Sequence, residues 1–246
     1  MNRAANIISA FTRLPFADLD QVTRGGTTLV VAPHPDDESL GCGGFIAESC
    51  ARQCPPVVVI MTDGTASHPS SPSYPPNRLR LVRERETRNA LSVLGLPRER
   101  LYFMRLRDSA MPVDGAPFEA AVANIQRLAR LFRCKMILAP WLRDPHCDHE
   151  TTQMMVRSAV RDLAVSIYSY PVWGWLLPPD TMLPDSIADG WRLNIAAHLN
   201  AKRRAIASHQ SQYSDLINDD PNGFRLPSEL LATFDRPYEV FVRTPL

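Results

Sequence analysis

Apolar runs alternate with stretches of helical periodicity along most of the chain. Runs such as Thr28 to Val31 and 57–61 are rich in β-branched residues and have the length of buried strands. Between these runs, apolar residues recur every three or four positions, which indicates helices that bury one face. The runs predicted as strands are 27–33, 57–61, 101–108, 136–140, 166–173 and 238–244. The stretches predicted as helices are 41–51, 77–94, 118–132, a segment that opens near 146 and continues to 164, and 199–209.

The alternation of these elements predicts the fold class. Strands separated by single helices imply right-handed crossovers and a mostly parallel sheet that is covered on both faces. We therefore expect a Rossmann-like three-layer α/β sandwich, with the last strand, 238–244, at a sheet edge. A length of 246 residues with 45% hydrophobic content fits one domain, 1–246, at least as well as two small ones.

Ionisable side chains follow the predicted strands where each strand ends. The first strand runs into His34, Pro35, Asp36, Asp37 and Glu38, and the segment after the fourth strand contains a second cluster, His-Cys-Asp-His, at 146–149. The carboxyl ends of parallel strands meet at one rim of a sheet, where ligands commonly bind. Carboxylates at adjacent positions resist ionising together unless a cation or a proton offsets their charge. The pattern predicts a divalent metal at this rim.

A segment rich in serine and proline, 65–77, follows the second predicted strand. Its composition is typical of an exposed, irregular loop. Because it begins beside the same rim, we regard it as a candidate lid over a substrate.

Charge and cysteine content exclude several classes of partner. The chain has 27 basic and 26 acidic residues spread along its length, and a formal net charge of +1, so no long-range field favours nucleic acid or an anionic membrane. The first 16 residues contain too short an apolar run for a signal peptide or a transmembrane segment. Five cysteines without a CxxC pair indicate reduced thiols, hence a cytoplasmic protein. The sequence is also compatible with a homo-oligomer.

The two clusters together supply a full catalytic metal site. Catalytic zinc takes three protein ligands, commonly nitrogen and carboxylate oxygen, and keeps one position for water. His34, Asp37 and His149 satisfy that count, with one zinc ion per chain. A base must still accept the proton of the activated water, and the adjacent Asp36 is the candidate.

The remaining ionisable residues of the second cluster complete the acid side of such a site. His146, as a histidinium, could stabilise an oxyanion and later protonate a departing amine. Asp148 would orient an imidazole and fix its tautomer. The alternatives are that His146 only binds substrate or supports the site, and that Asp148 caps the following helix. This chemistry suits hydrolysis of an unactivated amide.

The motifs resemble those of a known family. AxHPDDE followed by GCGG, with a later HxDH, is similar to the PIG-L/LmbE-like family of zinc-dependent N-deacetylases, and the similarity extends over about 27–212. The resemblance implies the same ligands, base and acid as above. It also implies that Arg83 and Asp108 bind sugar hydroxyls, against the alternative that Arg83 is a surface charge paired along its helix. Cys147 stands where many members have proline.

The expected function is therefore hydrolytic. We expect a zinc-dependent hydrolase that removes the acetyl group from an N-acetylated amino sugar or its conjugate, a small molecule. One alternative keeps the site but uses a non-sugar or natural-product amide. An alternative of another class is a Rossmann-like binding module without catalysis.

Overall fold

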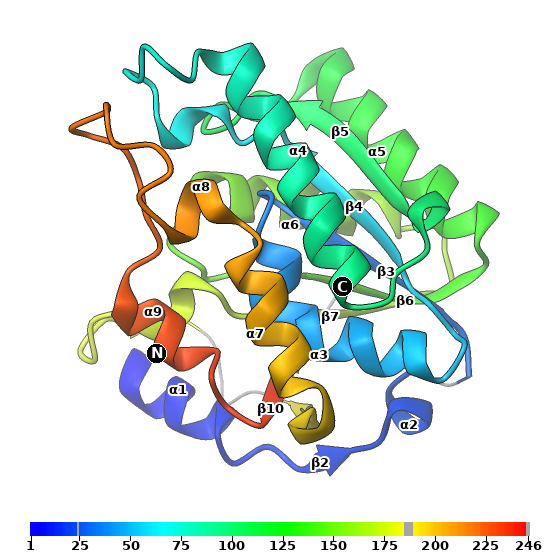
Figure 1. The fold of residues 1–246 in the computed structure, drawn as a ribbon. Coiled ribbons are helices and arrows are strands. Elements are labelled where there is room, and N and C mark those ends of the chain that lie inside the picture. The colour runs from blue at the N-terminus through cyan, green and yellow to red at the C-terminus, as the bar shows by residue number, and fades with distance from the viewer. Residues whose placement is uncertain (24, 185–188, 245–246) are drawn as a thin grey trace.

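A computed structural model describes residues 1–23, 25–184 and 189–244 of the chain (Figure 1). The strands are β1 (Asn2–Arg3), β2 (Phe16–Ala17), β3 (Thr27–Ala32), β4 (Val57–Thr62), β5 (Leu101–Leu106), β6 (Cys134–Pro140), β7 (Ser166–Tyr170), β8 (Met182–Leu183), β9 (Gly190–Asn194) and β10 (Tyr238–Arg243). The α-helices are α1 (Ala4–Phe11), α2 (Leu19–Thr23), α3 (Asp37–Ala51), α4 (Pro76–Val93), α5 (Gly115–Leu131), α6 (Cys147–Ala159), α7 (Leu199–Ala207), α8 (Gln210–Tyr213) and α9 (Ser228–Thr233).

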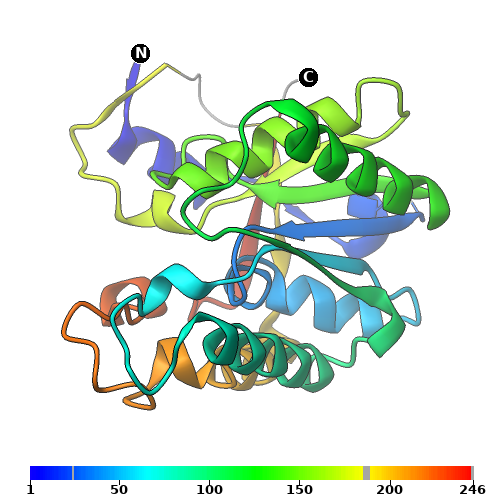
Figure 2. The ribbon, with the colours of Figure 1, turned by 90° about the horizontal axis from the view of Figure 1, so that it is seen from above.

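Eight strands form one sheet in the order β2-β9-β10-β7-β6-β3-β4-β5. The run from β7 to β5 is entirely parallel, and β10 pairs antiparallel with both β7 and β9. Helices cover both faces of the sheet, with α3, α4 and α7 on one side and α5 and α6 on the other (Figure 2). The prediction of a three-layer α/β sandwich with a mostly parallel sheet is confirmed.

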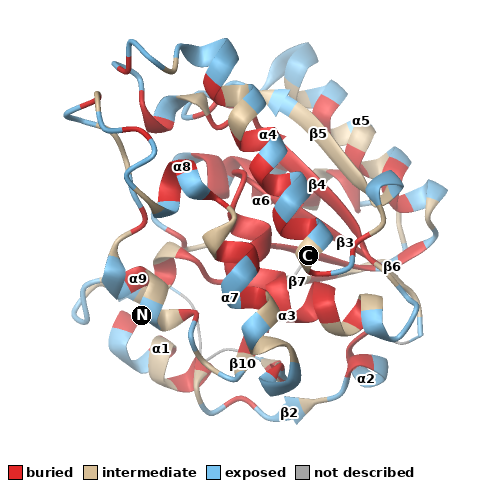
Figure 3. Ribbon diagram, viewed as in Figure 1, coloured by how far each residue is buried: buried red, intermediate tan, exposed pale blue. Residues whose placement is uncertain are grey.

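Alternate residues of the central strands point to opposite faces and build two separate cores. On β3, Val30 packs with Phe45 of α3 on one face, whereas Leu29 and Val31 pack with Ile125 of α5 on the other. All of these residues are shielded from solvent, so both faces of β3 are apolar, as in a covered parallel sheet. Figure 3 shows the resulting band of buried residues through β3, β4 and α3.

The C-terminal part of the sheet differs from the prediction. The last strand, β10, does not lie at an edge, because β9 pairs with its outer side and β2 pairs with β9. Neither β2 nor β9 was expected from the sequence. β2 is two residues long and β9 has the sequence GWRLN, so neither carries an apolar run that would mark it as a strand.

The segment 65–77 is also less exposed than predicted. Ser67, His68 and Ser71 are buried, and 65–67 form one turn of 3-10 helix. Asp219 accepts hydrogen bonds from the Ser71 hydroxyl (2.6 Å) and the Ser73 backbone N–H (2.9 Å), and Asp220 accepts one from the Ser70 N–H (2.8 Å). These carboxylates tie the segment to a second loop instead of leaving it free over the rim.

The N-terminal helix α1 packs on the body of the domain. Phe11 lies edge-on to Trp141 and Trp175, with ring centroids 5.2 and 5.7 Å apart. Among the described residues, no helix is both long and apolar enough to cross a membrane.

Candidate active site

A cavity of about 400 Å³ opens where β3, β4 and β5 end. Its polar wall carries most of the residues predicted from the sequence, and the rest of the wall is apolar. The polar lining residues include His34, Asp36, Asp37, Ser67, Arg83, Asp108, Ser109, His146 and Gln212, and the apolar ones include Leu40, Val172, Trp173, Phe224 and Leu226. Trp141 and Trp175 belong to the cluster around α1, so Trp173 is the tryptophan that reaches this cavity.

The loop between β3 and α3 places His34 and Asp37 side by side. Asp37 begins α3, four residues earlier than predicted, and its Oδ2 accepts a hydrogen bond from the His34 backbone N–H (2.9 Å). The same oxygen lies 3.1 Å from His34 Nδ1 and 3.2 Å from His149 Nε2. One carboxylate oxygen thus joins two histidines that are 115 positions apart in the sequence.

Asp36, between these residues, has a strained backbone. Its φ is 138°, a value that residues with a Cβ rarely adopt and that is found mostly at functional sites. Glu38 stabilises this conformation because its Oε2 accepts a hydrogen bond from the Asp36 N–H (2.9 Å). Glu38 is itself held by His209, whose Nε2 lies 3.0 Å from Glu38 Oε1. The conformation of Asp36 therefore depends on a helix end far along the chain.

The second cluster is organised by the start of α6. His146 is the N-cap of this helix, and its Nδ1 accepts a hydrogen bond from the Asp148 N–H (3.2 Å). Because Nδ1 is an acceptor here, the proton of a neutral His146 ring resides on Nε2. Asp148 Oδ2 lies 3.1 Å from His34 Nε2, so Asp148 orients the imidazole of the other cluster. His149 is completely buried, and its Nδ1 lies 2.9 Å from Asp144 Oδ2.

These donors fit a small divalent cation. His149 Nε2 is buried and makes no hydrogen bond, although it faces a carboxylate oxygen. Ligands at about 2.0–2.2 Å from a tetrahedral zinc ion are separated from one another by about 3.3 Å. The separations of 3.1 and 3.2 Å around Asp37 Oδ2 match that spacing. His34, His146 and His149 also bring their ligand atoms within 4.8 Å of one another.

The electrostatics of the site favour a cation as well. Burial opposes a charge on His149, but Asp37 and Asp144 overcome it and raise the pKa of this histidine to about 9. For His34, burial is likewise outweighed by Asp108, Asp148 and Asp37, which raise its pKa well above the usual value. A group of carboxylates that attracts protons so strongly attracts a metal ion for the same reason.

Asp36 and His146 have pKa values displaced toward neutral forms. Burial raises the pKa of Asp36 to about 7, although the Arg83 guanidinium opposes the shift. Burial, together with the charges of His34 and His149, lowers the pKa of His146 to about 4. This displacement favours the neutral imidazole of His146 at pH 7.

The two residues predicted to bind sugar lie in the cavity wall. Arg83 is 3% exposed, so the alternative of a surface charge paired along α4 is wrong. Asp108 is 7% exposed; its Oδ2 accepts a hydrogen bond from the Ala66 N–H (2.9 Å), and its Oδ1 lies 3.4 Å from His34 Nε2. The structure thus brings together all eight residues that the sequence singled out.

Several residues of the site were missed from the sequence. Asp144 accepts hydrogen bonds from the backbone N–H groups of Val172 and Gly174 besides contacting His149. Its position between a strand end and a histidine cluster was a usable signal. The apolar wall could not be predicted, because Phe224 and Leu226 belong to a loop without hydrophobic periodicity. This loop contacts the 65–77 segment through the Phe224 N–H, which donates a hydrogen bond to the Ser67 carbonyl (2.7 Å).

Comparison with solved structures shows the same fold in proteins of low sequence identity. N,N'-diacetylchitobiose deacetylase from Pyrococcus horikoshii is 19% identical, with 92% of this chain and 90% of that chain covered and a TM-score of 0.66. The zinc-inhibited form of the teicoplanin deacetylase Orf2 is 19% identical, with 89% and 98% covered and a TM-score of 0.62. The 4-carboxy-2-hydroxymuconate hydratase from Pseudomonas putida KT2440 is 19% identical, with 74% and 78% covered and a TM-score of 0.59.

The fold and the side-chain set define an α/β protein with a candidate metal centre at the carboxyl ends of its parallel strands. The family model described as PIG-L, GlcNAc-PI de-N-acetylase, matches residues 29–160, and the chain belongs to this family. The resemblance stated from the motifs is thereby confirmed. Membership supports an enzyme that removes N-acetyl groups.

Proposed function

We propose that the protein is a zinc-dependent hydrolase that removes the acetyl group from an N-acetylated amino sugar or its conjugate. The observation that carries this proposal is the shared oxygen of Asp37, which lies between the nitrogens of His34 and His149 in a cavity that also contains Asp36. His34, Asp37 and His149 would hold the ion. When bound, zinc supplies Lewis acidity and makes the water that it coordinates easier to deprotonate.

The chain's own residues supply the proton transfers. Asp36 accepts a proton from the attacking water as the water oxygen bonds to the acyl carbon. The carbon–nitrogen bond then breaks, acetate leaves, and the nitrogen takes a proton to become a free amine. A pKa near 7 suits Asp36 to accept a proton and to return it.

His146 and Asp148 act on the other side of the reacting group. With its proton on Nε2, neutral His146 donates a hydrogen bond to the acyl oxygen as negative charge develops there. Asp148 holds the His34 ring through Nε2, which leaves Nδ1 directed at Asp37. Asp108, on the cavity wall, is proposed to accept a hydrogen bond from a substrate hydroxyl.

A second candidate keeps the site but changes the substrate. Trp173 and Phe224 form an edge-on pair (5.7 Å between centroids) in the cavity wall, and Leu226 and Val172 extend this apolar side. Such a wall suits an apolar group close to the amide, as in a non-sugar or natural-product amide. The non-catalytic binding module is disfavoured because every residue of the proposed machinery is present and assembled.

Acetate release from a panel of amides tests these candidates. N-acetylglucosamine, N-acetylglucosamine conjugates with lipid or aromatic aglycones, and simple N-acetylated amines would be compared with the zinc-loaded wild-type protein. The Asp36→Asn variant is the matched control, and we expect it to keep its metal but lose turnover by about 10²–10⁴-fold.

The proposal fails if no N-acetylated compound releases acetate, or if exhaustively chelated protein is fully active. Release from non-sugar amides alone would select the second candidate. Because a hydratase shares this fold, 4-carboxy-2-hydroxymuconate belongs in the same panel. Hydration of this compound without acetate release from any amide would contradict the proposed hydrolysis.

A further inference from the structure

The basic residues are unevenly distributed in the folded protein. The segment 76–107, which contains α4 and β5, carries nine of the 27 basic residues of the chain and only three of its 26 acidic ones. The rest of the chain therefore has 18 basic against 23 acidic residues. β5 is an edge strand of the sheet, and α4 lies beside it (Figure 1). A net charge near zero thus conceals a basic region at one edge of the molecule.

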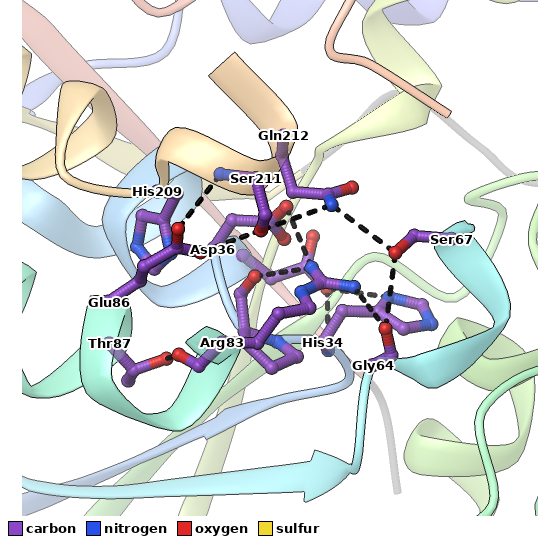
Figure 4. Close-up of polar contacts among 12 residues, drawn as sticks. His34, Asp36, Gly64, Ser67, Arg83, Glu86, Thr87, His209, Ser211 and Gln212 are labelled. Carbon is purple, nitrogen blue, oxygen red and sulfur yellow. Dashed lines mark hydrogen bonds and ion pairs between the residues drawn. The ribbon is translucent and has the colours of Figure 1, made fainter. Parts of the chain in front are cut away.

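The inner side of α4 has charged residues that are matched within the protein. Arg83 Nη2 donates a hydrogen bond to the Pro35 carbonyl (2.6 Å) and lies 3.2 Å from Asp36 Oδ2 (Figure 4). Glu86, also on this side, accepts hydrogen bonds from the Ser211 backbone N–H (2.8 Å) and hydroxyl (2.6 Å). The charge that α4 presents to solvent therefore comes from its other side.

The outer side of α4 carries exposed arginines around one leucine. Arg78, Arg85 and Arg88 are exposed, and together with Leu81 they recur every three or four positions, so they share one side of the helix. Leu81 is 59% exposed. Both acidic residues of α4 are buried, so the helix exposes no carboxylate beside these arginines.

A single buried carboxylate offsets the charge of the neighbouring arginines. Glu84 contacts Arg80 at 3.1 Å and Arg88 at 2.9 Å. It also contacts Arg105 of β5 at 2.7 Å, and half of the Arg105 side chain is exposed. Three guanidinium groups thus share one negative charge. We call the resulting surface the basic face; it consists of Arg78, Arg80, Leu81, Arg85, Arg88 and Arg105.

The chemistry of the basic face fits an anionic lipid surface. Arginines near such a surface are attracted by its negative potential, and each adds to the attraction. Leu81, in the middle of the face, can enter the boundary between headgroups and acyl chains, as apolar residues of interfacial helices do. A nucleic acid would offer phosphates to the arginines but would place this leucine against a charged backbone. The exposed leucine therefore favours lipid over nucleic acid.

We propose that the basic face docks the protein on membranes that contain anionic lipids. Neither the docking nor its test depends on the reaction proposed above. One leucine contributes little beside five arginines, so the attachment is mainly electrostatic and reversible. It should therefore disappear at high ionic strength.

Co-sedimentation of the protein with unilamellar vesicles tests this proposal. We expect binding to vesicles of phosphatidylcholine mixed with phosphatidylglycerol, and none to vesicles of phosphatidylcholine alone. Binding should be lost in about 1 M salt, where the Debye length is about 3 Å. No binding to the anionic vesicles, or equal binding to both kinds, would overturn the proposal.

A double variant, Arg78→Gln with Arg85→Gln, tests which face binds. Neither residue belongs to the candidate active site or contacts Glu84, so the fold should be kept. Each arginine near an anionic surface contributes about fivefold in affinity, so we expect affinity for the anionic vesicles to fall by about 25-fold. Arg127→Gln with Arg130→Gln is the matched control, because it removes the same charge from exposed positions of α5 on the other side of the sheet (Figure 2). An equal loss in both variants, or no loss in the first, would overturn the proposal.

A short DNA duplex tests the alternative occupant. At the same ionic strength, the duplex should bind the wild-type protein more weakly than the anionic vesicles do. Leu81→Gln should weaken vesicle binding severalfold and leave duplex binding unchanged. Tighter binding of the duplex, or vesicle binding unaffected by Leu81→Gln, would overturn the assignment of this face to lipid.

Discussion

The two segments that meet at the candidate metal centre are built in different ways. The segment 144–149 is a regular helix start, in which His146 is the N-cap and Asp144 contacts His149 five positions away. The segment 34–38 has a strained residue at its centre, and its supports come from Arg83 and His209, far along the chain. The histidines of one half are therefore oriented mainly by sequence neighbours, whereas the other half is held by residues far along the chain.

The difference assigns different work to the two halves. The half at 144–149 contains His149, the proposed buried ligand, and His146, the proposed hydrogen-bond donor, whose ring is oriented by the start of the helix. The strained half holds Asp36 between two proposed ligands, where a relaxed backbone would direct its carboxylate elsewhere. Substitutions in 144–149 should therefore lower metal affinity. Substitutions that affect 34–38 should lower turnover or stability.

The largest effect is expected from His149, a proposed ligand that contacts Asp37 of the other half. His149→Ala removes the imidazole that faces Asp37, and we expect the loss in metal affinity to exceed the 10–100-fold typical of a residue that only orients a ligand. Zinc content after dialysis against a weak chelator measures it. His198→Ala, a histidine paired with Glu48 away from the cavity, is the control. Retention of a full zinc equivalent in His149→Ala would show that the ion lies elsewhere.

Asp144→Asn should weaken the half at 144–149 without removing a ligand. Its carboxylate contacts His149 Nδ1, and an amide can neither match that charge nor accept as strongly from Val172 and Gly174. We expect metal affinity to fall by about 10–100-fold. Competition with a fluorescent zinc chelator measures the change, with Asp20→Asn at the exposed Arg52 pair as control. Unchanged affinity would show that the His149–Asp144 contact has no influence on metal binding.

The smallest effect on the metal is expected from Glu38→Gln, which tests the strained half. Glu38 is fully buried and holds the Asp36 N–H, while His209 contacts its other oxygen. Loss of its charged hydrogen bonds should lower the free energy of unfolding by about 2 kcal/mol and reduce kcat, with zinc affinity close to wild type. Urea unfolding of the zinc-free protein measures the stability. Wild-type stability together with weakened zinc binding in Glu38→Gln would contradict the different roles assigned to the two segments.

Much of the fold could be predicted because the central strands are buried on both faces. β3, β4 and β6 read as continuous apolar runs, and the helices between them show clear periodicity. The position of β10 could not be read in the same way. β10 is an inner strand because β9 pairs with its outer side. β9 has a mixed composition and lies more than 40 residues before β10 in the chain, so its pairing could not be predicted.

The residues of the site were predictable by type, but their supports were not. His34, Asp36, Asp37, His146 and His149 stand out because ionisable residues follow strand ends, and the structure gathers them in one cavity wall or directly behind it. The contacts that hold them join residues such as Glu38 and His209, 171 positions apart. A sequence pattern shows which side chains could take part in catalysis. Only the fold shows which other residues hold those side chains in place.

The most direct test of the central claim is anomalous diffraction at the zinc edge from crystals of the zinc-loaded protein. The account predicts one strong peak per chain, within about 2.0–2.2 Å of His34 Nδ1, an Asp37 carboxylate oxygen and His149 Nε2. No peak at this position, or a single peak held by His146, Cys147 and Asp148 instead, would contradict it.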